Sequence, residues 1–167
     1  MGRALFAAAA LVLAACAASG KAAQSAPSSA HVGQPAPQWT EPIAPSGTLS
    51  SDALQGHPVY LNFFASWCGP CNDEAPSIEA LQEKYGPQGL RIVGIDVLES
   101  AQKAEDFKKE YHLTYPAVVD DGKLRDAYHI NGLPVHVFID RSGVVRNIVI
   151  GQMSPDEIRN AVLTIMK

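Results

Sequence analysis

The chain has 167 residues, 47% of them hydrophobic and 18% charged, and a formal net charge of −4 at pH 7. This length allows one domain with an appendage, and the apolar content suffices for one hydrophobic core. Because the basic residues are scattered and fewer than the acidic ones, the charge gives no indication of a nucleic-acid surface. We therefore expect one globular domain that has no nucleic-acid partner.

Residues 1–15 have the composition of a secretory signal peptide. Arg3 supplies a positive charge, residues 4–15 form an unbroken apolar run, and Cys16 follows Leu13-Ala14-Ala15 directly. The run is too short to span a bilayer as a permanent helix. A cysteine in this place resembles a bacterial lipobox, in which Cys16 becomes the lipidated first residue of the mature chain. The alternative is an ordinary signal peptide cleaved nearby, with Cys16 incidental.

Residues 16–33 consist mainly of Ala, Ser, Gly, Gln and Pro, with almost no large apolar side chain. Such a segment buries too little surface to offset the entropy of ordering. We expect a flexible tether between a lipidated Cys16 and a single domain over residues 34–167. Assigning Cys16 to lipid leaves one pair among the three cysteines, Cys68 and Cys71. In an exported protein one such pair is not a scaffold of structural disulfides.

The predicted elements of the domain alternate between strands and helices. An edge hairpin is expected around Trp39, Ile43 and Leu49, and residues 58–64 are apolar enough for a strand covered on both faces. Further strands are predicted at 90–97, 116–119, 135–139 and 144–150, and helices at 69–85, 100–111, 123–129 and after Ser154, where Glu157 completes a capping box. This order predicts a mixed α/β sheet with helices on both faces.

The Cys-x-x-Cys motif follows the strand at 58–64 and opens the helix at 69–85. Cys68 is therefore expected at a helix N-terminus, where unpaired backbone N–H groups and the helix dipole stabilise a thiolate. Cys71, one turn further along, is expected to lie against the core. An exposed thiolate beside a shielded thiol can attack a disulfide and then resolve the mixed disulfide.

The residues around the motif resemble a known family. Trp67-Cys68-Gly69-Pro70-Cys71 with Pro76 is similar to the active site of thioredoxin. The flanks resemble the membrane-tethered TlpA/ResA-like branch at residues 33–37, 61–67, 74–76 and 132–140. The resemblance implies an α/β thioredoxin-like fold: a central mixed β-sheet with helices on both faces, an N-terminal β-extension and an inserted helix-strand segment. It also implies an extracytoplasmic thiol-disulfide oxidoreductase whose redox group is a Cys68–Cys71 disulfide, with no other cofactor and no metal.

The same resemblance assigns roles to residues around the cysteines. Pro134 is implied to follow a cis peptide bond and to lie against the two cysteines, so that the backbone of Leu133 can pair with an extended substrate peptide. We place Trp67, Gly69 and Pro70 at the same substrate contact. These five residues are the predicted substrate-binding set.

Glu74 is the third predicted catalytic residue, after the two cysteines. The buried aspartate of thioredoxin is replaced here by Asn62, which cannot titrate. In the ResA-like branch a glutamate three residues after the second cysteine takes that part, and Glu74 stands there. It is implied to accept the proton of Cys71; the alternative is an acid favoured only by the helix dipole. His136 is expected to be a strand residue facing a helix, without a metal role.

The spacing of residues in the sequence argues against several other roles for the cysteine pair. A zinc site requires a second Cys or His pair, and the five histidines show no such spacing. A disulfide across two residues closes too small a loop to stabilise the fold much. A peroxiredoxin needs a proline and a hydroxyl residue where Leu61 and Ala65 stand. The remaining alternative is a Sco-like copper-binding metallochaperone, although that family separates its cysteines by three residues.

The expected function is reduction of protein disulfides outside the cytoplasm. Gly69-Pro70 between the cysteines resembles the reducing thioredoxins, and an oxidising compartment requires a membrane thiol donor to recharge the protein. We expect a monomer, lipid-anchored to a bacterial membrane on its periplasmic or extracytoplasmic face. Its expected partners are disulfide-containing exported proteins, such as apocytochrome c or copper-site proteins.

Overall fold

Strand β3 (Val59–Phe64) is an inner strand of the sheet in this computed structural model, which describes residues 29–167. All six of its residues are buried. It pairs in parallel with β4 (Arg91–Val97) on one side and antiparallel with β6 (Val135–Ile139) on the other. This confirms the prediction, made from the apolar run at 58–64, of a strand covered on both faces.

The strands of the described residues form one seven-stranded mixed sheet in the order β2-β1-β5-β4-β3-β6-β7. Strand β4 pairs in parallel with β5, and the remaining pairs are antiparallel. The bounds of these other strands are β1 Thr40–Ala44, β2 Thr48–Ser50, β5 Ala117–Asp120 and β7 Val145–Ile150. The predicted edge hairpin is β1–β2. Because β1 also pairs with β5, β2 alone forms this edge of the sheet.

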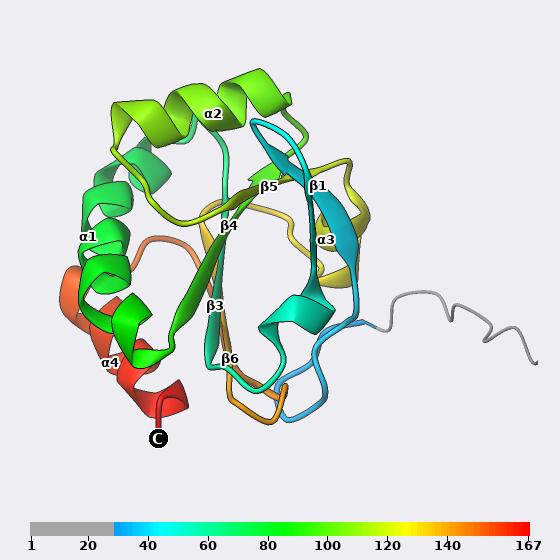
Figure 1. Cartoon of the computed structure of the whole chain (residues 1–167), viewed down its shortest axis with the longest axis vertical. Coiled ribbons are helices and arrows are strands. Elements are labelled where there is room, and N and C mark those ends of the chain that lie inside the picture. Colours follow the sequence, from blue (N-terminus) through cyan, green and yellow to red (C-terminus); the bar gives the residue numbers. More distant parts are fainter. Residues whose placement is uncertain (1–28) are drawn as a thin grey trace, which may run out of the picture.

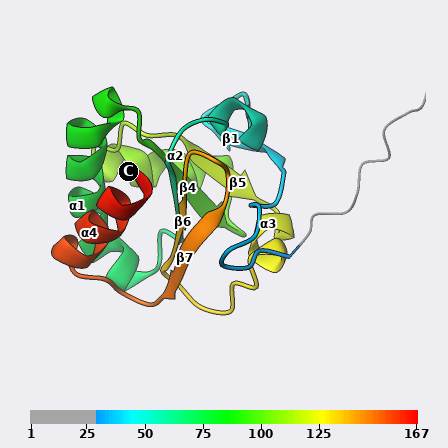
Figure 2. The ribbon, with the colours of Figure 1, turned by 90° about the horizontal axis from the view of Figure 1, so that it is seen from below.

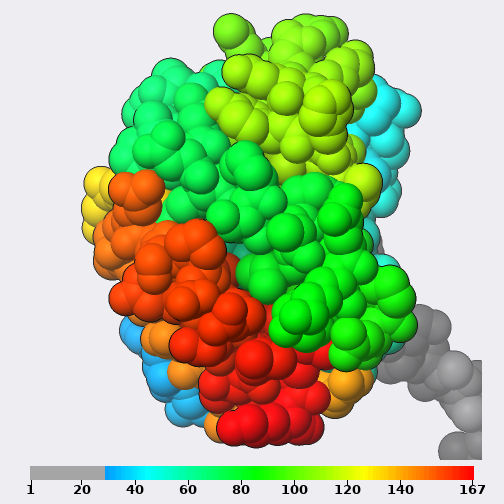
Figure 3. Space-filling model, turned by 90° about the vertical axis from the view of Figure 1, so that its left-hand side faces the viewer, coloured from blue at the N-terminus to red at the C-terminus, as the bar shows by residue number. Residues whose placement is uncertain are grey.

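Helices cover both faces of the sheet, as the sequence predicts. One face carries α1 (Gly69–Tyr85), α2 (Ala101–Glu110) and α4 (Pro155–Ile165), which Figure 3 shows side by side. The other face carries α3 (Lys123–Ala127) and the segment before β1 (Figure 2). Two short 3-10 turns, η1 (Ser51–Leu54) and η2 (Gly86–Gln88), precede β3 and β4.

The alternation of side chains along β3 divides the core into two layers. Tyr60 and Phe64 pack under α1 and α2, whereas Leu61 and Phe63 pack toward α3. Successive side chains of a strand point to opposite faces, so a run in which every residue is apolar serves both layers. The same alternation carries Asn62 to the α1 face.

The segment from residue 29 to β1 belongs to the domain. The N–H of Ala30 donates to the carbonyl of Ala127 at 2.8 Å, that of Gly33 donates to Val145 at 2.8 Å, and the ring of His31 lies 6.1 Å from that of His129. Contacts with the domain thus begin before residue 34, where the sequence analysis sets its start. The predicted signal peptide and Cys16 lie outside the described residues.

No helix within residues 29–167 combines the length and the apolar character that crossing a membrane requires.

The segment between β4 and β6 contains the predicted insertion. Helix α2, strand β5 and helix α3 follow one another there, and β5 joins the central sheet between β4 and β1. Ser100 caps α2 through the N–H of Lys103, and the predicted capping box of Ser154 and Glu157 opens α4. These caps satisfy N–H groups that have no partner within the helix.

Gly94 on β4 packs closely against Phe64, which precedes the cysteine motif. A Cβ at this position of β4 would lie 2.9 Å from Cε1 of Phe64 and 3.4 Å from Cε2 of Tyr115. We expect Gly94→Ala to destabilise the protein by about 1–3 kcal/mol in urea unfolding, because the buried rings must shift. Gly132→Ala is the control, since a Cβ there meets nothing within 4 Å. Equal losses in the two variants would contradict this view of the packing.

Candidate active site

The two cysteines lie at the N-terminus of α1, where the sequence predicts them. They are joined by a disulfide, and Cys68 is the N-cap residue of the helix. The N–H of Cys71 lies 3.3 Å from Sγ of Cys68. Gly69 and Pro70 form the first turn, where a proline loses no intrahelical hydrogen bond. A backbone N–H and the positive end of the helix dipole thus converge on the sulfur that would carry the charge after reduction.

The expectation that Cys68 is exposed is wrong for this oxidised state. Cys68 and Cys71 retain only 4% and 3% of their surface, because both pack in the core cluster that also contains Ala65 and Ala75. Burial therefore does not distinguish the two cysteines. The difference between them is the N–H of Cys71, which points at Cys68.

A groove of about 630 Å³ borders the site and brings together two of the predicted substrate-binding residues, Trp67 and Leu133. Trp67 is 72% exposed and Leu98, which also lines the groove, is 57% exposed. The remaining lining comes from Val97 and from residues of α3 and the loop after it: Arg125, Asp126, His129, Ile130, Asn131 and Gly132. The groove thus presents an exposed indole beside the disulfide.

The other predicted substrate-binding residues lie outside the lining of this groove. Pro134 is buried, follows a cis peptide bond as the resemblance implies, and accepts the N–H of Gly151 at 2.9 Å. Gly69 and Pro70 are exposed on the first turn of α1. They are accessible to a partner but do not shape the groove.

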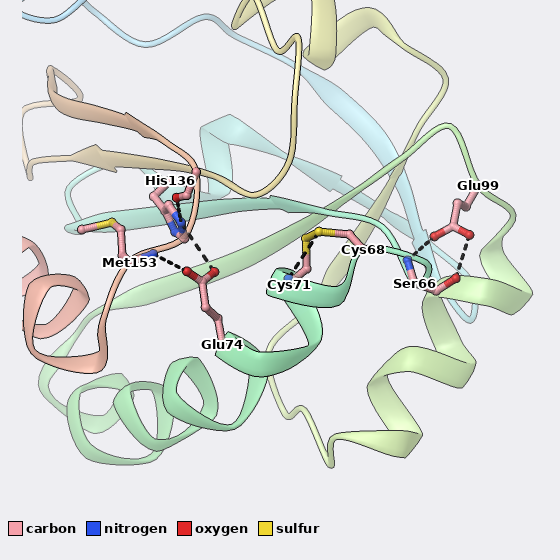
Figure 4. Close-up of a disulfide and its surroundings, with 8 residues drawn as sticks. Ser66, Cys68, Cys71, Glu74, Glu99, His136 and Met153 are labelled. Carbon is pink, nitrogen blue, oxygen red and sulfur yellow. Dashed lines mark hydrogen bonds and ion pairs between the residues drawn. A yellow bond between two sulfur atoms is a disulfide. The ribbon is translucent and has the colours of Figure 1, made fainter.

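Glu74 lies on α1 three residues after Cys71 and retains only 3% of its surface. Its Oε1 accepts the N–H of Met153, and its Oε2 lies 3.5 Å from Nε2 of His136 (Figure 4). Burial raises the pKa of Glu74 to about 7 against the lowering effect of the Met153 N–H, and the charge of Asp73 adds to the rise. A carboxyl with such a pKa can take up and release a proton near neutrality.

His136 is a site residue that the sequence analysis missed. It faces α1 as expected, is completely buried, and its Nδ1 lies 2.8 Å from the hydroxyl of Tyr60. Its Nε2 lies 3.2 Å from the carbonyl oxygen of Gly151. Burial lowers the pKa of His136 to about 4, although the Gly151 contact opposes this effect, so the ring is neutral at pH 7 and its contact with Glu74 is not an ion pair.

A signal for His136 was present in the sequence. A polar ring in the middle of the apolar run at 135–139 has to find buried partners. The register of the sheet supplies the missing information, because His136 pairs with Asn62 on β3 and therefore shares its α1-facing side. Tyr60, two residues before Asn62 on the same strand, reaches the ring from that side.

A second acidic group borders the segment before Cys68. Glu99 accepts the N–H of Ser66 at 2.5 Å and its hydroxyl at 2.8 Å (Figure 4). Asp96 on β4 lies beside Phe64 in the sheet and is completely buried. Burial raises the pKa of Asp96 to about 8, and the neighbouring Glu99 adds to the rise. The sequence alone assigned no role to Asp96 or Glu99.

One group of three acidic side chains in the described part of the chain lies close enough to share a cation: Glu41, Asp120 and Asp121. Asp120 accepts the N–H groups of Leu124 and Arg125, both at 2.9 Å, and so caps α3. Asp121 is paired with Lys123. Asp120 and Asp121 thus have structural partners.

The copper alternative requires a histidine ligand beside the cysteines. Both ring nitrogens of His136 already have partners, Tyr60 and Gly151.

Comparisons with known proteins agree with this geometry. The model of the AhpC/TSA family matches residues 32–148. The thiol-disulfide oxidoreductase ResA of Bacillus cereus is 30% identical over 129 residues, which cover 77% of this chain and 75% of the relative. ResA of Geobacillus kaustophilus is 35% identical over 105 residues, or 62% of this chain and 60% of the relative.

Solved structures with the same fold include two proteins above 25% identity. A thiol:disulfide interchange protein of the thioredoxin family from Chlorobium tepidum superposes with a TM-score of 0.76 at 28% identity, covering 82% of this chain and 99% of the other. A secreted disulfide oxidoreductase from Mycobacterium tuberculosis, described as homologous to E. coli DsbE, gives a TM-score of 0.71 at 27% identity over 76% and 96%.

The family match covers the cysteine motif and the strands and helices from β1 to β6. Relatives of 30–35% identity are thiol-disulfide oxidoreductases. The chain therefore belongs to the AhpC/TSA family, within its thioredoxin-like thiol-disulfide oxidoreductases of the ResA type.

Proposed function

We propose that this thiol-disulfide oxidoreductase reduces protein disulfides outside the cytoplasm, with Cys68 as nucleophile, Cys71 as resolving thiol and Glu74 as base. The observation that carries the proposal is the order of groups along α1. The N–H of Cys71 points at Cys68 at the helix N-terminus, and a buried carboxyl with a pKa of about 7 follows three residues after Cys71. Nucleophile, resolving thiol and base are thus held by one rigid element.

The reaction proceeds as two thiol-disulfide exchanges. The Cys68 thiolate attacks one sulfur of a substrate disulfide, forming a mixed disulfide and expelling the other substrate sulfur as a thiolate. Glu74 then takes the proton of Cys71, whose thiolate attacks Sγ of Cys68 and releases the second substrate sulfur. The substrate gains two electrons and the protein ends as the Cys68–Cys71 disulfide, the state described here. A membrane thiol donor returns the two electrons.

The groove beside Trp67 and Leu133 is the proposed contact for the substrate. An extended segment on either side of the substrate cysteine can lie along it, with the exposed indole of Trp67 against its side chains. The proposed clients are disulfide-containing exported proteins, with apocytochrome c and copper-site proteins as candidates.

The proposed location is the extracytoplasmic face of a bacterial membrane, with the chain held there as a monomer through lipid on Cys16. Support comes from the apolar run at 4–15 that ends at Cys16 and from the described secretion of the Mycobacterium tuberculosis protein. An oxidising compartment also explains why a reductase there depends on an electron donor in the membrane.

Replacing Cys71 with Ser tests the exchange chemistry. The variant should accumulate mixed disulfides between Cys68 and exported proteins, because no thiol remains to resolve them. The products are identified by mass spectrometry after non-reducing separation. The double variant Cys68→Ser/Cys71→Ser is the control and should yield none. An absence of adducts in Cys71→Ser itself would show that Cys68 does not attack protein disulfides.

Replacing Glu74 with Gln tests the base. Reduced protein mixed with a symmetrical aromatic disulfide releases two aromatic thiols, the second when Cys71 resolves the adduct. The wild-type rate of this second step should rise with pH through about 7, where Glu74 ionises. Glu74→Gln should lose that inflection and slow by about 100-fold at pH 8. Glu83→Gln, on the exposed side of the same helix, should behave as wild type. An unchanged profile in Glu74→Gln would make Glu74 a structural acid.

Replacing Cys16 with Ser tests the anchor. The membrane form of the wild-type protein should begin at Cys16 and carry acyl chains, detected by intact mass spectrometry and by incorporation of labelled fatty acid. Cys16→Ser should incorporate no label, whereas Ser19→Ala should incorporate as much as wild type. Acylation of Cys16→Ser, or an unmodified wild-type Cys16, would remove the lipid anchor from the proposal.

A further inference from the structure

We propose that His136 and Tyr60 position the carboxylate of Glu74, with the Nε2–H group of a neutral His136 held beside it as a hydrogen-bond donor. The inference rests on the proposed role of Glu74 as base, and it adds two residues to that function. It applies to the step in which Glu74 takes the proton of Cys71.

The two partners of the His136 ring determine which nitrogen carries its hydrogen. The carbonyl oxygen of Gly151, 3.2 Å from Nε2, can only accept, so Nε2 has to carry a hydrogen. Nδ1 of a neutral imidazole is then an acceptor, and the hydroxyl of Tyr60, 2.8 Å away, donates to it. Burial raises the pKa of Tyr60 well above its usual value, so Tyr60 remains a donor. One tautomer satisfies both contacts.

This tautomer directs a donor at the oxygen of Glu74 that needs one. Oε1 accepts the N–H of Met153, whereas Oε2 is buried and has no hydrogen-bond partner among the described residues. Nε2 of His136 lies 3.5 Å from Oε2, a few tenths of an ångström beyond a normal hydrogen bond. The hydrogen on Nε2 of His136, which also points at the Gly151 carbonyl, therefore interacts with the carboxylate once Glu74 is charged.

The contact favours the charged form of Glu74 over the neutral one. Burial and the charge of Asp73 both act against ionisation, and the Met153 N–H acts for it. The N–H of His136 is a second donor that, like the Met153 N–H, favours the ionised form of Glu74. Without it, ionisation of Glu74 requires a higher pH.

His136 does not itself relay the proton. Nε2 already carries a hydrogen and Nδ1 already accepts from Tyr60, so the ring could take a proton from Glu74 only as a buried cation. Burial lowers the pKa of His136 to about 4, which disfavours that cation. His136 is therefore a positioning residue, and the proton of Glu74 leaves by another route.

The remaining titratable groups around the pair lie on α1 and just before β5. Asp73 and Cys71 lie with Glu74 on α1. Tyr115, before β5, is buried in the same core cluster as Tyr60 of β3, and its pKa is raised by burial and by Glu79. From the segment after β7 only backbone groups, those of Gly151 and Met153, reach the pair. Among the described residues near it, no cation offsets the charge of Glu74.

Two substitutions at His136 separate positioning from packing. Gln can place an amide N–H where Nε2 stands, whereas Leu fills similar space without any donor. The second thiol release is measured between pH 5 and 9 for wild type, both variants and Glu74→Gln. His136→Leu should move the midpoint upward by about one pH unit and slow the step about 10-fold at pH 6. His136→Gln should restore most of the shift.

The outcomes distinguish this inference from the proposed function. A midpoint in His136→Leu equal to that of wild type, while Glu74→Gln loses the inflection, would overturn the positioning role alone. An unchanged Glu74→Gln would remove the base itself, and the positioning role with it. Equal shifts in His136→Leu and His136→Gln would show that packing, and not the donor, matters.

A measurement on the wild-type protein does not depend on whether the variants fold. In nitrogen-15 NMR spectra, His136 should be neutral and carry its hydrogen on Nε2 from pH 5 to 9. Its Nε2–H resonance should shift with the same midpoint as the side-chain carboxyl carbon of Glu74. A hydrogen on Nδ1, or a His136 signal that does not change while Glu74 titrates, would overturn the proposal.

Discussion

A carboxyl group buried behind a disulfide is a costly feature of this fold. Ionised Glu74 opposes folding, because burial removes water from a charge that receives one backbone N–H and one long contact to His136. Its pKa in the folded state, about 7, lies above the value near 4.3 of an unfolded chain. Stability is therefore lost as the pH rises between these values. A group that destabilises the resting protein at neutral pH is typical of a site that serves a reaction.

The sheet explains why the other groups of the site meet. Strands β3 and β4 run in parallel and end together, so Phe64 and Asp96 lie side by side and the loops after them begin at the same edge. The bond from Ser66 to Glu99 joins those two loops. The antiparallel strand β6 brings Leu133 and Pro134 to the same edge from the opposite direction. Three loops, each short, thus surround the first turn of α1.

The sequence predicted what depends on neighbouring residues and missed what depends on distant ones. Periodicity and capping residues located the helix after Cys68, the strand before it and the capping box at Ser154, because each depends on contacts within a few residues. The burial of Cys68 depends on how Ala65 and Ala75 pack, and the contact of His136 with Glu74 depends on a register across three strands and a helix. Neither can be read from spacing along the chain. The cis bond before Pro134 was reached only through the family resemblance.

The attachment of Ala30 to α3 has a consequence for where the protein can act. The bond from Ala30 to Ala127 and the contact of His31 with His129 fix the start of the domain beside residues that line the groove. Fourteen peptide units separate Ala30 from Cys16, and a fully extended chain of that length covers about 50 Å. A lipid on Cys16 would therefore confine the groove to a thin layer of space above the bilayer. Encounters within that layer would be set by lateral diffusion of membrane proteins as much as by affinity.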